Sequence, residues 1–290
     1  MRPDPAAGLA PSTLGHWRGH LSLHYTRDGE RTIALDRHEG PLRVLQRLYP
    51  EGPGICHHVL VHPPGGIVGG DQLEIAATLE PGTHALITTP GATRFYRSLG
   101  AAAAQRAMLR VAAGARLEWL PLETIAYRGC LAENALRLEL AEGAETLGWD
   151  VLALGLPTAG EPFDAGHFTQ HLEIPGCWLE RGRIAADDTR LLDSPLGLAG
   201  QPVMATAWFA GGSALADARR EALLDAARDC ATASPLALRC GATSPHRQVV
   251  VLRVLAPRVE PAMALLTQVR AAWRRIAWGL TPNPPRVWQT

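Results

Sequence analysis

The sequence predicts an α+β fold that is mainly β, with a layered solenoid-like or sandwich-like β body and two amphipathic helices in the C-terminal third. Between Trp17 and Phe209, short segments alternate apolar and polar residues, as half-buried strands do. Glycine and proline interrupt these segments at intervals too short for long helices. The last third carries apolar residues at helical spacing. No low-complexity linker divides the chain, so we expect residues 1–290 to form a single domain.

The strand pattern is clearest at Leu21–Tyr25 and Leu136–Leu140, where apolar and polar residues alternate. One face of each strand is therefore expected in the core and the other in water. A weak internal repeat consists of three units that each read as strand, Gly turn, strand. This spacing is typical of stacked β-hairpin layers, whose neighbours bury each other's apolar face. The turn glycines lie 32 and 29 residues apart, at Gly82, Gly114 and Gly143.

Two helices are expected after residue 212. The first, Ser213 to Cys230, carries an apolar stripe of Leu215, Ala218, Ala222, Leu223, Ala226 and Cys230. A strand at Gln248–Leu255 leads to the second helix, from Pro261 to about Trp278, which Gly279 and the following prolines end. Its apolar stripe is Leu265, Leu266, Val269, Trp273 and Ile276, and the arginines expected to face away from it are Arg270, Arg274 and Arg275.

Tryptophan is concentrated between residues 273 and 288, at Trp273, Trp278 and Trp288. Aromatic residues anchor many protein interfaces, although they are also ordinary core residues. We therefore expect an apolar patch for a partner in this region, unless all three indoles are buried within the monomer.

Charge and lysine content exclude several classes of function. The 28 basic residues balance the 28 acidic ones, so no net field draws the protein to nucleic acid or to an anionic membrane. All 28 basic residues are arginine. A Walker A loop and a pyridoxal phosphate enzyme each need a lysine, so neither chemistry can run on this polypeptide alone.

Cysteine usage and the N-terminal sequence favour a cytoplasmic protein. The five cysteines are scattered and form no C-x-x-C pair, which argues against a disulfide framework and against a structural zinc site. The segment Met1–Pro11 lacks the long apolar core of a signal peptide, and no later stretch of about 18 apolar residues occurs.

The densest motif is His62–Asp71, which reads HPPGGIVGGD. Its glycines do not fit a phosphate-binding loop. We interpret it as a rigid turn, in which glycine supplies positive φ and Asp71 bonds the backbone. A second motif, Thr88–Ser98, mixes two arginines with Phe95 and Tyr96, a composition typical of interaction surfaces. Equally, the aromatic rings of this motif can cover the core while the arginines reach solvent.

Histidines gather at two places without forming a complete metal site. His57, His58 and His62 lie close in sequence, and His167 and His171 share one face of a strand or helix. Stable zinc or nickel sites need three or four converging ligands, and no such set is evident. We therefore predict no catalytic residue, no resident metal and no stably bound cofactor.

Five segments together resemble the UreD family of urease accessory proteins, in the same order and at similar spacing. They are His62–Asp71, Thr89–Ser98, Trp119–Ile125, Trp149–Gly155 and Pro285–Trp288, and the resemblance spans most of the chain. The residues of the two Gly/Pro-rich family motifs are His62, Pro63, Pro64, Gly65, Gly66, Gly69, Gly70, Pro90, Gly91, Arg94, Phe95, Tyr96 and Arg97.

The resemblance implies a non-enzymatic chaperone of urease maturation. Such a chaperone joins partners of the UreF type and the GTPase UreG type on the urease apoprotein and helps nickel, in transit, to reach the active site. Asp71 and Glu180 match acidic family positions and are candidates for an internal polar path, while Tyr127–Cys130 and Gly182 depart from the family pattern. The competing interpretation is a β-rich hydrolase in which Asp71 or Glu180 pairs with a nearby histidine.

The lack of lysine predicts that the purified chain neither binds GTP tightly nor hydrolyses it, because no ammonium group is available for the β- and γ-phosphates. Calorimetric titration of the isolated protein with GTP and magnesium measures this directly. Stoichiometric binding would contradict the prediction.

Overall fold

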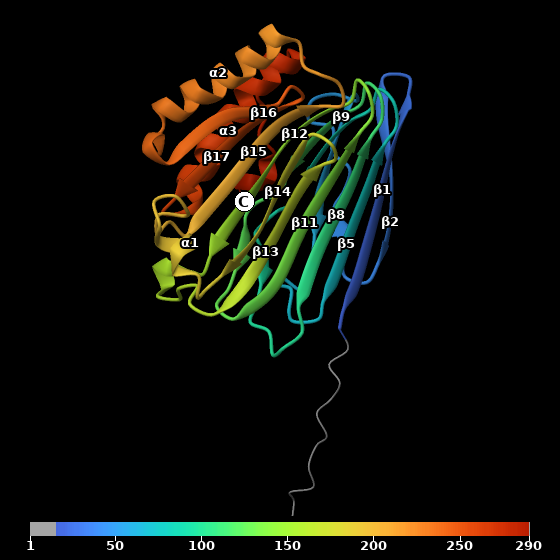
Figure 1. The fold of residues 1–290 in the computed structure, drawn as a ribbon. Coiled ribbons are helices and arrows are strands. Elements are labelled where there is room, and N and C mark those ends of the chain that lie inside the picture. The colour runs from blue at the N-terminus through green and yellow to red at the C-terminus, as the bar shows by residue number, and fades with distance from the viewer. Residues whose placement is uncertain (1–15, 290) are drawn as a thin grey trace, which may run out of the picture.

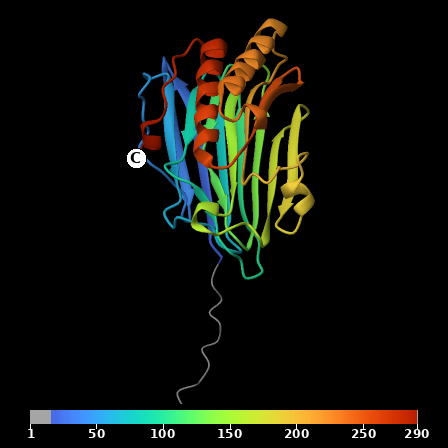
Figure 2. The same ribbon diagram turned by 90° about the vertical axis from the view of Figure 1, so that its left-hand side faces the viewer.

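The computed structural model describes residues 16–289, so the expectation for Met1–Pro11 lies outside the described residues. Two β-sheets face each other, and two long helices cover the outer side of one of them (Figures 1 and 2). The seven-stranded sheet has the order β14 (Trp178–Ala185), β13 (Gly166–Ile174), β11 (Cys130–Leu140), β8 (Ala103–Val111), β5 (Gln72–Leu79), β1 (Arg18–Asp28) and β2 (Arg31–Glu39).

The second sheet is ten-stranded. Its main path is β16 (Cys240–His246), β17 (Val249–Ala256), β15 (Val203–Gly211), β12 (Glu145–Leu154), β9 (Arg116–Leu120), β6 (His84–Thr88), β4 (Ile55–Val61) and β3 (Arg43–Val44), and β10 (Thr124–Ala126) and β7 (Thr93–Phe95) lie off this path. The helices of the described chain are α1 (Thr189–Asp193), α2 (Asp217–Ala233) and α3 (Val259–Trp278), with short 3₁₀ turns η1 (Pro157–Ala159), η2 (Ala237–Arg239) and η3 (Arg286–Gln289). None of these helices is long and apolar enough to cross a membrane.

Successive strands of the central part alternate between the two sheets. The chain passes from β5 to β6, from β8 to β9 and from β11 to β12, changing sheet each time. Each strand then pairs in parallel with the equivalent strand of the next unit. The repeat is therefore a two-strand arch wound as a solenoid. The prediction of hairpin units was wrong, because the two strands of a unit face each other across the core instead of sharing hydrogen bonds.

The glycine turns of the repeat are confirmed. Gly82, Gly114 and Gly143 have φ of +71°, +68° and +75°, which glycine adopts at no steric cost. The turns also stack. The backbone N–H of Gly82 donates to Ala113 at 3.3 Å and that of Gly114 donates to Gly143 at 3.2 Å. The shared turn geometry thus keeps neighbouring arches in register.

The main core fills the space between the sheets. Leu21, Leu23 and Tyr25 are fully buried there, as the alternation predicted. The ten-stranded sheet also buries its outer face under α2 and α3, in a second apolar cluster. Strand β12 is consequently buried along almost its whole length and has a nearly continuous apolar sequence.

The helices are confirmed with shifted bounds and faces. Helix α2 begins at Asp217, four residues later than predicted, and buries Leu223, Leu224, Ala227 and Ala231. Ala218 and Ala222 are exposed, so the predicted stripe was rotated relative to the observed one. Helix α3 begins at Val259, and Ile276, which was expected in its stripe, is exposed.

The three C-terminal tryptophans differ in exposure. Trp273 and Trp278 are buried in the cluster beneath the helices. Trp288 is half-buried, lies against the Trp149 ring at a centroid distance of 5.4 Å, and donates from Nε1 to the Thr88 hydroxyl. Because Trp288 is not fully buried, the partner patch in this region stays a prediction, whereas Trp273 and Trp278 belong to the core.

Two arginines of α3 contradict the sequence prediction most clearly. Arg270 and Arg274 were expected to face away from the core, but they are 2% and 0% exposed. Both form ion pairs with the buried carboxylate of Glu118 on β9, at 2.7 Å and 3.2 Å, and Arg274 also pairs with Glu51 at 2.7 Å. Burial raises the pKa of Glu118, but Arg270, the hydrogen bond from His84 and Arg274 together lower it to about 2.

Replacing Glu118 with Gln is expected to lower the free energy of unfolding by about 3–5 kcal/mol, because two buried guanidinium groups lose their shared carboxylate. Since the pKa of Glu118 is lower in the folded state than in the unfolded chain, its contribution is present above pH 4.5 and is lost as the pH falls toward 2. Urea titrations at several pH values measure both effects. The half-exposed Glu139, which pairs with Arg110, is the control, and Glu139→Gln should cost less than about 1 kcal/mol. Equal effects of the two variants would contradict this assignment.

Candidate functional site

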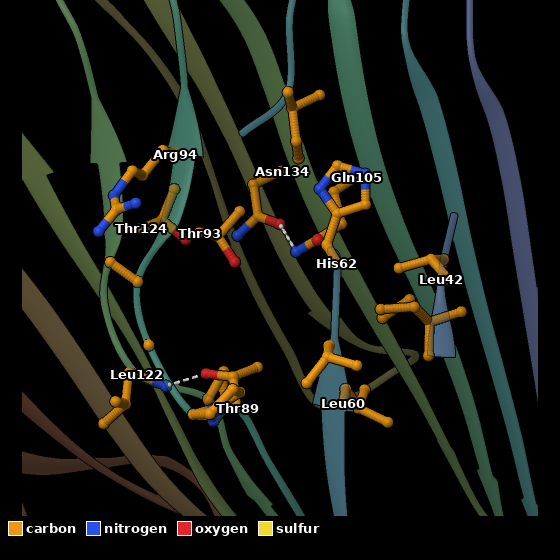
Figure 3. Close-up of a pocket in the computed structure, with 18 of the residues that line it drawn as sticks. Leu42, Leu60, His62, Thr89, Thr93, Arg94, Gln105, Leu122, Thr124 and Asn134 are labelled. Carbon is orange, nitrogen blue, oxygen red and sulfur yellow. Dashed lines mark hydrogen bonds between the residues drawn. The ribbon is translucent and has the colours of Figure 1, made fainter. Parts of the chain in front are cut away.

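A cavity of about 340 Å³ opens between the two sheets, beside the two Gly/Pro-rich motifs (Figure 3). His62 of the first motif and Thr93 and Arg94 of the second line it. Gln105 from β8 and Asn134 from β11 line it as well. The cavity thus brings together the two segments that carry the strongest sequence signals.

Backbone hydrogen bonds join the two motifs. The N–H of Ile67 donates to the carbonyl of Arg94 at 2.7 Å, and the N–H of Tyr96 donates to Ile67 at 2.9 Å. The Tyr96 ring lies so close to Gly66 that a Cβ there would stand 1.9 Å from it. Phe95 is fully buried against Phe168, whereas Arg94 is exposed. Phe95 and Arg94 therefore fit the second interpretation, in which the ring covers the core and the arginine reaches solvent, and the interaction surface stays a prediction.

The first motif is a rigid turn, as predicted. Gly65 and Gly70 have φ of +79° and +91°, which few other residues adopt. Asp71 is buried and accepts hydrogen bonds from the backbone N–H groups of Trp17 and Val68, both at 3.0 Å. Burial lowers the pKa of His62, and the nearby Asp71 carboxylate partly opposes this. Asp71 thus holds the loop that presents His62 to the cavity.

Inward-facing polar residues form one layer across the sandwich, which we call the polar layer. In the seven-stranded sheet, Gln105, Asn134 and Gln170 occupy neighbouring positions on β8, β11 and β13. In the ten-stranded sheet, Asp150, Thr206 and Arg253 are neighbours on β12, β15 and β17. Glu180 of β14 completes the layer through its contacts with Thr206 and Arg253.

Asp150 is the centre of this layer. It is buried, lines the cavity, and accepts hydrogen bonds from the side-chain amides of Asn134, at 3.0 Å, and of Gln170. Among the described residues, no arginine or histidine pairs with it. Burial raises the pKa of Asp150 to about 6, the Gln170 and Asn134 amides oppose the rise, and the Glu180 charge adds to it. A buried carboxylate without a basic partner is rare and usually marks function.

Glu180 lies further along the layer, on β14, the edge strand of the seven-stranded sheet. The hydroxyl of Thr206 donates to Oε1 at 3.0 Å, and the guanidinium of Arg253 donates to Oε2 from Nε at 2.9 Å. The Glu180 side chain is mostly buried, whereas Arg253 is about half exposed. The structure therefore brings Glu180, but not Asp71, into the polar layer.

The other sequence candidates do not converge. His167 and His171 lie on the outer face of the seven-stranded sheet, while His57 and His58 are buried in β4. Within residues 16–289, no group of three or more His, Cys, Asp or Glu could hold a metal ion. Neither Asp71 nor Glu180 hydrogen-bonds a histidine in the described chain. The carboxylate–histidine pair of the hydrolase interpretation is therefore not formed by either residue.

Sequence reasoning missed Asp150, Asn134 and Gln170. The available signal was Asp150 itself, the lone charge inside the apolar run Trp149–Gly155. The two amides carried no signal, because each stands in a strand of ordinary alternating pattern.

Comparison with known proteins identifies the family. A family model described as UreD urease accessory protein matches residues 17–289. The chain belongs to the UreD family of urease accessory proteins. Its membership confirms the resemblance carried by the Gly/Pro-rich motifs and implies a role in urease maturation.

Three UreD relatives match over nearly their whole length. The urease accessory protein UreD of Leptothrix cholodnii is 64% identical over 276 residues, covering 94% of this chain and 99% of its own. The proteins of the same name from Verminephrobacter eiseniae and Paracidovorax citrulli are 63% and 61% identical over 272 residues, with the same coverage.

Replacing Asp150 with Asn is expected to change how the stability of this UreD-family chain depends on pH. The folded-state pKa of Asp150 lies above its unfolded value, so its favourable contribution is present below pH 3.8 and is lost as the pH rises through 6. The wild-type chain should therefore lose on the order of 3 kcal/mol relative to the variant between pH 4 and pH 6. Urea titrations across this range measure the difference, and parallel pH profiles would contradict the raised pKa.

Proposed function

We propose that this chain is a non-catalytic chaperone of urease maturation in the cytoplasm. It binds the urease apoprotein together with accessory proteins of the UreF and UreG types, and its residues 1–290 act as one domain. Membership of the UreD family supports the role in maturation. The absence of lysine supports the assignment of any nucleotide hydrolysis to a partner.

The same proposal includes help in nickel delivery, with nickel as a cargo that passes through the cavity and the polar layer. The observation that carries it is Asp150, a buried carboxylate that faces the cavity without a basic partner. Carboxylate and imidazole groups are suitable ligands for nickel. His62 and Asp150, which line the cavity, and Glu180, which is joined to the polar layer through Thr206, provide such groups.

A low affinity for nickel at each position of the path suits a protein that carries the ion and releases it. Asp150 is the only carboxylate among the described residues that line the cavity, and its other neighbours in the layer are uncharged amides and a hydroxyl. Tight nickel or zinc sites use three or four strong ligands, and such a site would retain the ion. A path of single ligands lets the ion move on. Asp71 has an indirect place in this proposal, since it fixes the loop that carries His62.

The path predicts that Asp150→Asn and Glu180→Gln each lower nickel-dependent urease activation by about tenfold, because each removes one negative ligand at little change in shape. Urease activity and nickel content of the urease are measured after co-expression with the other accessory proteins. Pull-down of the urease apoprotein by each variant shows whether the complex still assembles.

Glu133→Gln is the matched control, because Glu133 is a half-exposed carboxylate on the outer face of the sheet. It should leave activation unchanged. Full activation by an Asp150→Asn, Glu180→Gln double variant would overturn the path, while the chaperone assignment would then rest on the pull-down.

A further inference from the structure

The Arg253 side chain occupies the place at Glu180 that a cation would take. Its Nε and Nη2 atoms both approach Oε2 of Glu180, at 2.9 Å and 2.7 Å, while the Thr206 hydroxyl holds Oε1 at 3.0 Å. The strand register places Arg253 beside Thr206, and Thr206 beside Asp150. We propose that Arg253 is a displaceable internal competitor that keeps Glu180 from binding a divalent cation tightly. This inference rests on the proposed function.

Arg253 is an inward-facing residue that can nevertheless reach water. It alternates with Val249 and Val251, which lie in the core between the sheets. Its side chain is 51% exposed, on the strand next to the edge strand β16. A long arginine side chain in this setting can swing into solvent while its aliphatic stem stays packed, at small desolvation cost. The guanidinium can therefore leave Glu180 when a cation arrives and return when the cation departs.

Counting charges shows what Arg253 changes. Asp150 and Glu180 are close enough for the charge of one to act on the other. When ionised, Asp150, Glu180 and Arg253 together carry one net negative charge. Without Arg253, the two carboxylates would carry two negative charges toward a divalent cation. Two unopposed carboxylates at the edge of a low-dielectric interior attract such a cation strongly. Arg253 thus weakens the site, because its positive charge offsets one of the two carboxylates.

In this proposal, the charge of Arg253, and not a bulky side chain, hinders a cation from passing Glu180. Gly182 on β14 pairs in register with Gln170, and a Cβ at Gly182 would meet no atom within 4 Å. The space beside the layer is therefore open at this glycine, one of the two departures from the family pattern. Gly182 itself adds no side chain here, and in this proposal the Arg253–Glu180 contact is the feature that controls passage.

Nickel binding to the purified chain tests the inference. Arg253→Met should bind Ni²⁺ at least about tenfold more tightly than the wild type, and should release it more slowly to an added chelator. Arg253→Lys keeps the charge and should stay near the wild-type affinity. The double variant Arg253→Met, Glu180→Gln should lose the gain. If Arg253→Met does not fold, Arg253→Gln gives the same comparison.

Arg106→Met is the matched control. It frees Glu133 on the outer face of the sheet, away from the polar layer, so nickel affinity should not rise. Wild-type affinity and release in a folded Arg253→Met variant would overturn the inference. If Asp150→Asn and Glu180→Gln still lower urease activation in that case, the nickel path stands without the Arg253 competitor. Normal activation by those two variants would instead remove the path itself.

Discussion

The parallel register of the wound arches is the constraint on which the rest of the structure depends. Because each arch repeats the one before it, inward residues at one level of a strand lie beside inward residues at the same level of its neighbours. A shift of one residue would send every inward side chain to the opposite face of its sheet. The stacked glycine turns fix this register, and the polar layer exists because they do.

The charge cluster around Glu118 and the polar layer differ in their ratio of positive to negative groups. This difference distinguishes a structural cluster from a candidate functional one. Around Glu118, two arginines meet two carboxylates in the interior, and each carboxylate also has a histidine neighbour. Such a balanced cluster attaches α3 to the sheet, and both of its carboxylates are already paired with arginine. The polar layer instead holds two carboxylates and a single arginine, at its edge. An excess of buried negative charge costs stability, which singles out the polar layer as the candidate site.

Much of the fold could be predicted from the sequence, because alternation, glycine turns and helical spacing are local signals. Whether a turn joins two hairpin strands or two sheets could not, since Gly82 allows the same positive φ in either case. The burial of Arg270 was also hidden, because its partner Glu118 lies 152 residues away and the helix pattern treats arginine as a surface residue. At the site, the family motifs indicated Glu180, while the position of Asp150 depended on a register that only the structure supplies.

Asp71 and Asp150 show why burial of a carboxylate does not by itself define a path. Both are 6% exposed. The Asp71 carboxylate, however, accepts hydrogen bonds from the backbone N–H groups of Trp17 and Val68, which need acceptors when buried. The donors to Asp150 are instead the side-chain amides of Asn134 and Gln170. An amide side chain can rotate and offer its carbonyl oxygen in place of its N–H₂ group. The hydrogen bonds to Asp150 can therefore change partners without breaking a turn, whereas those to Asp71 hold the backbone of its loop.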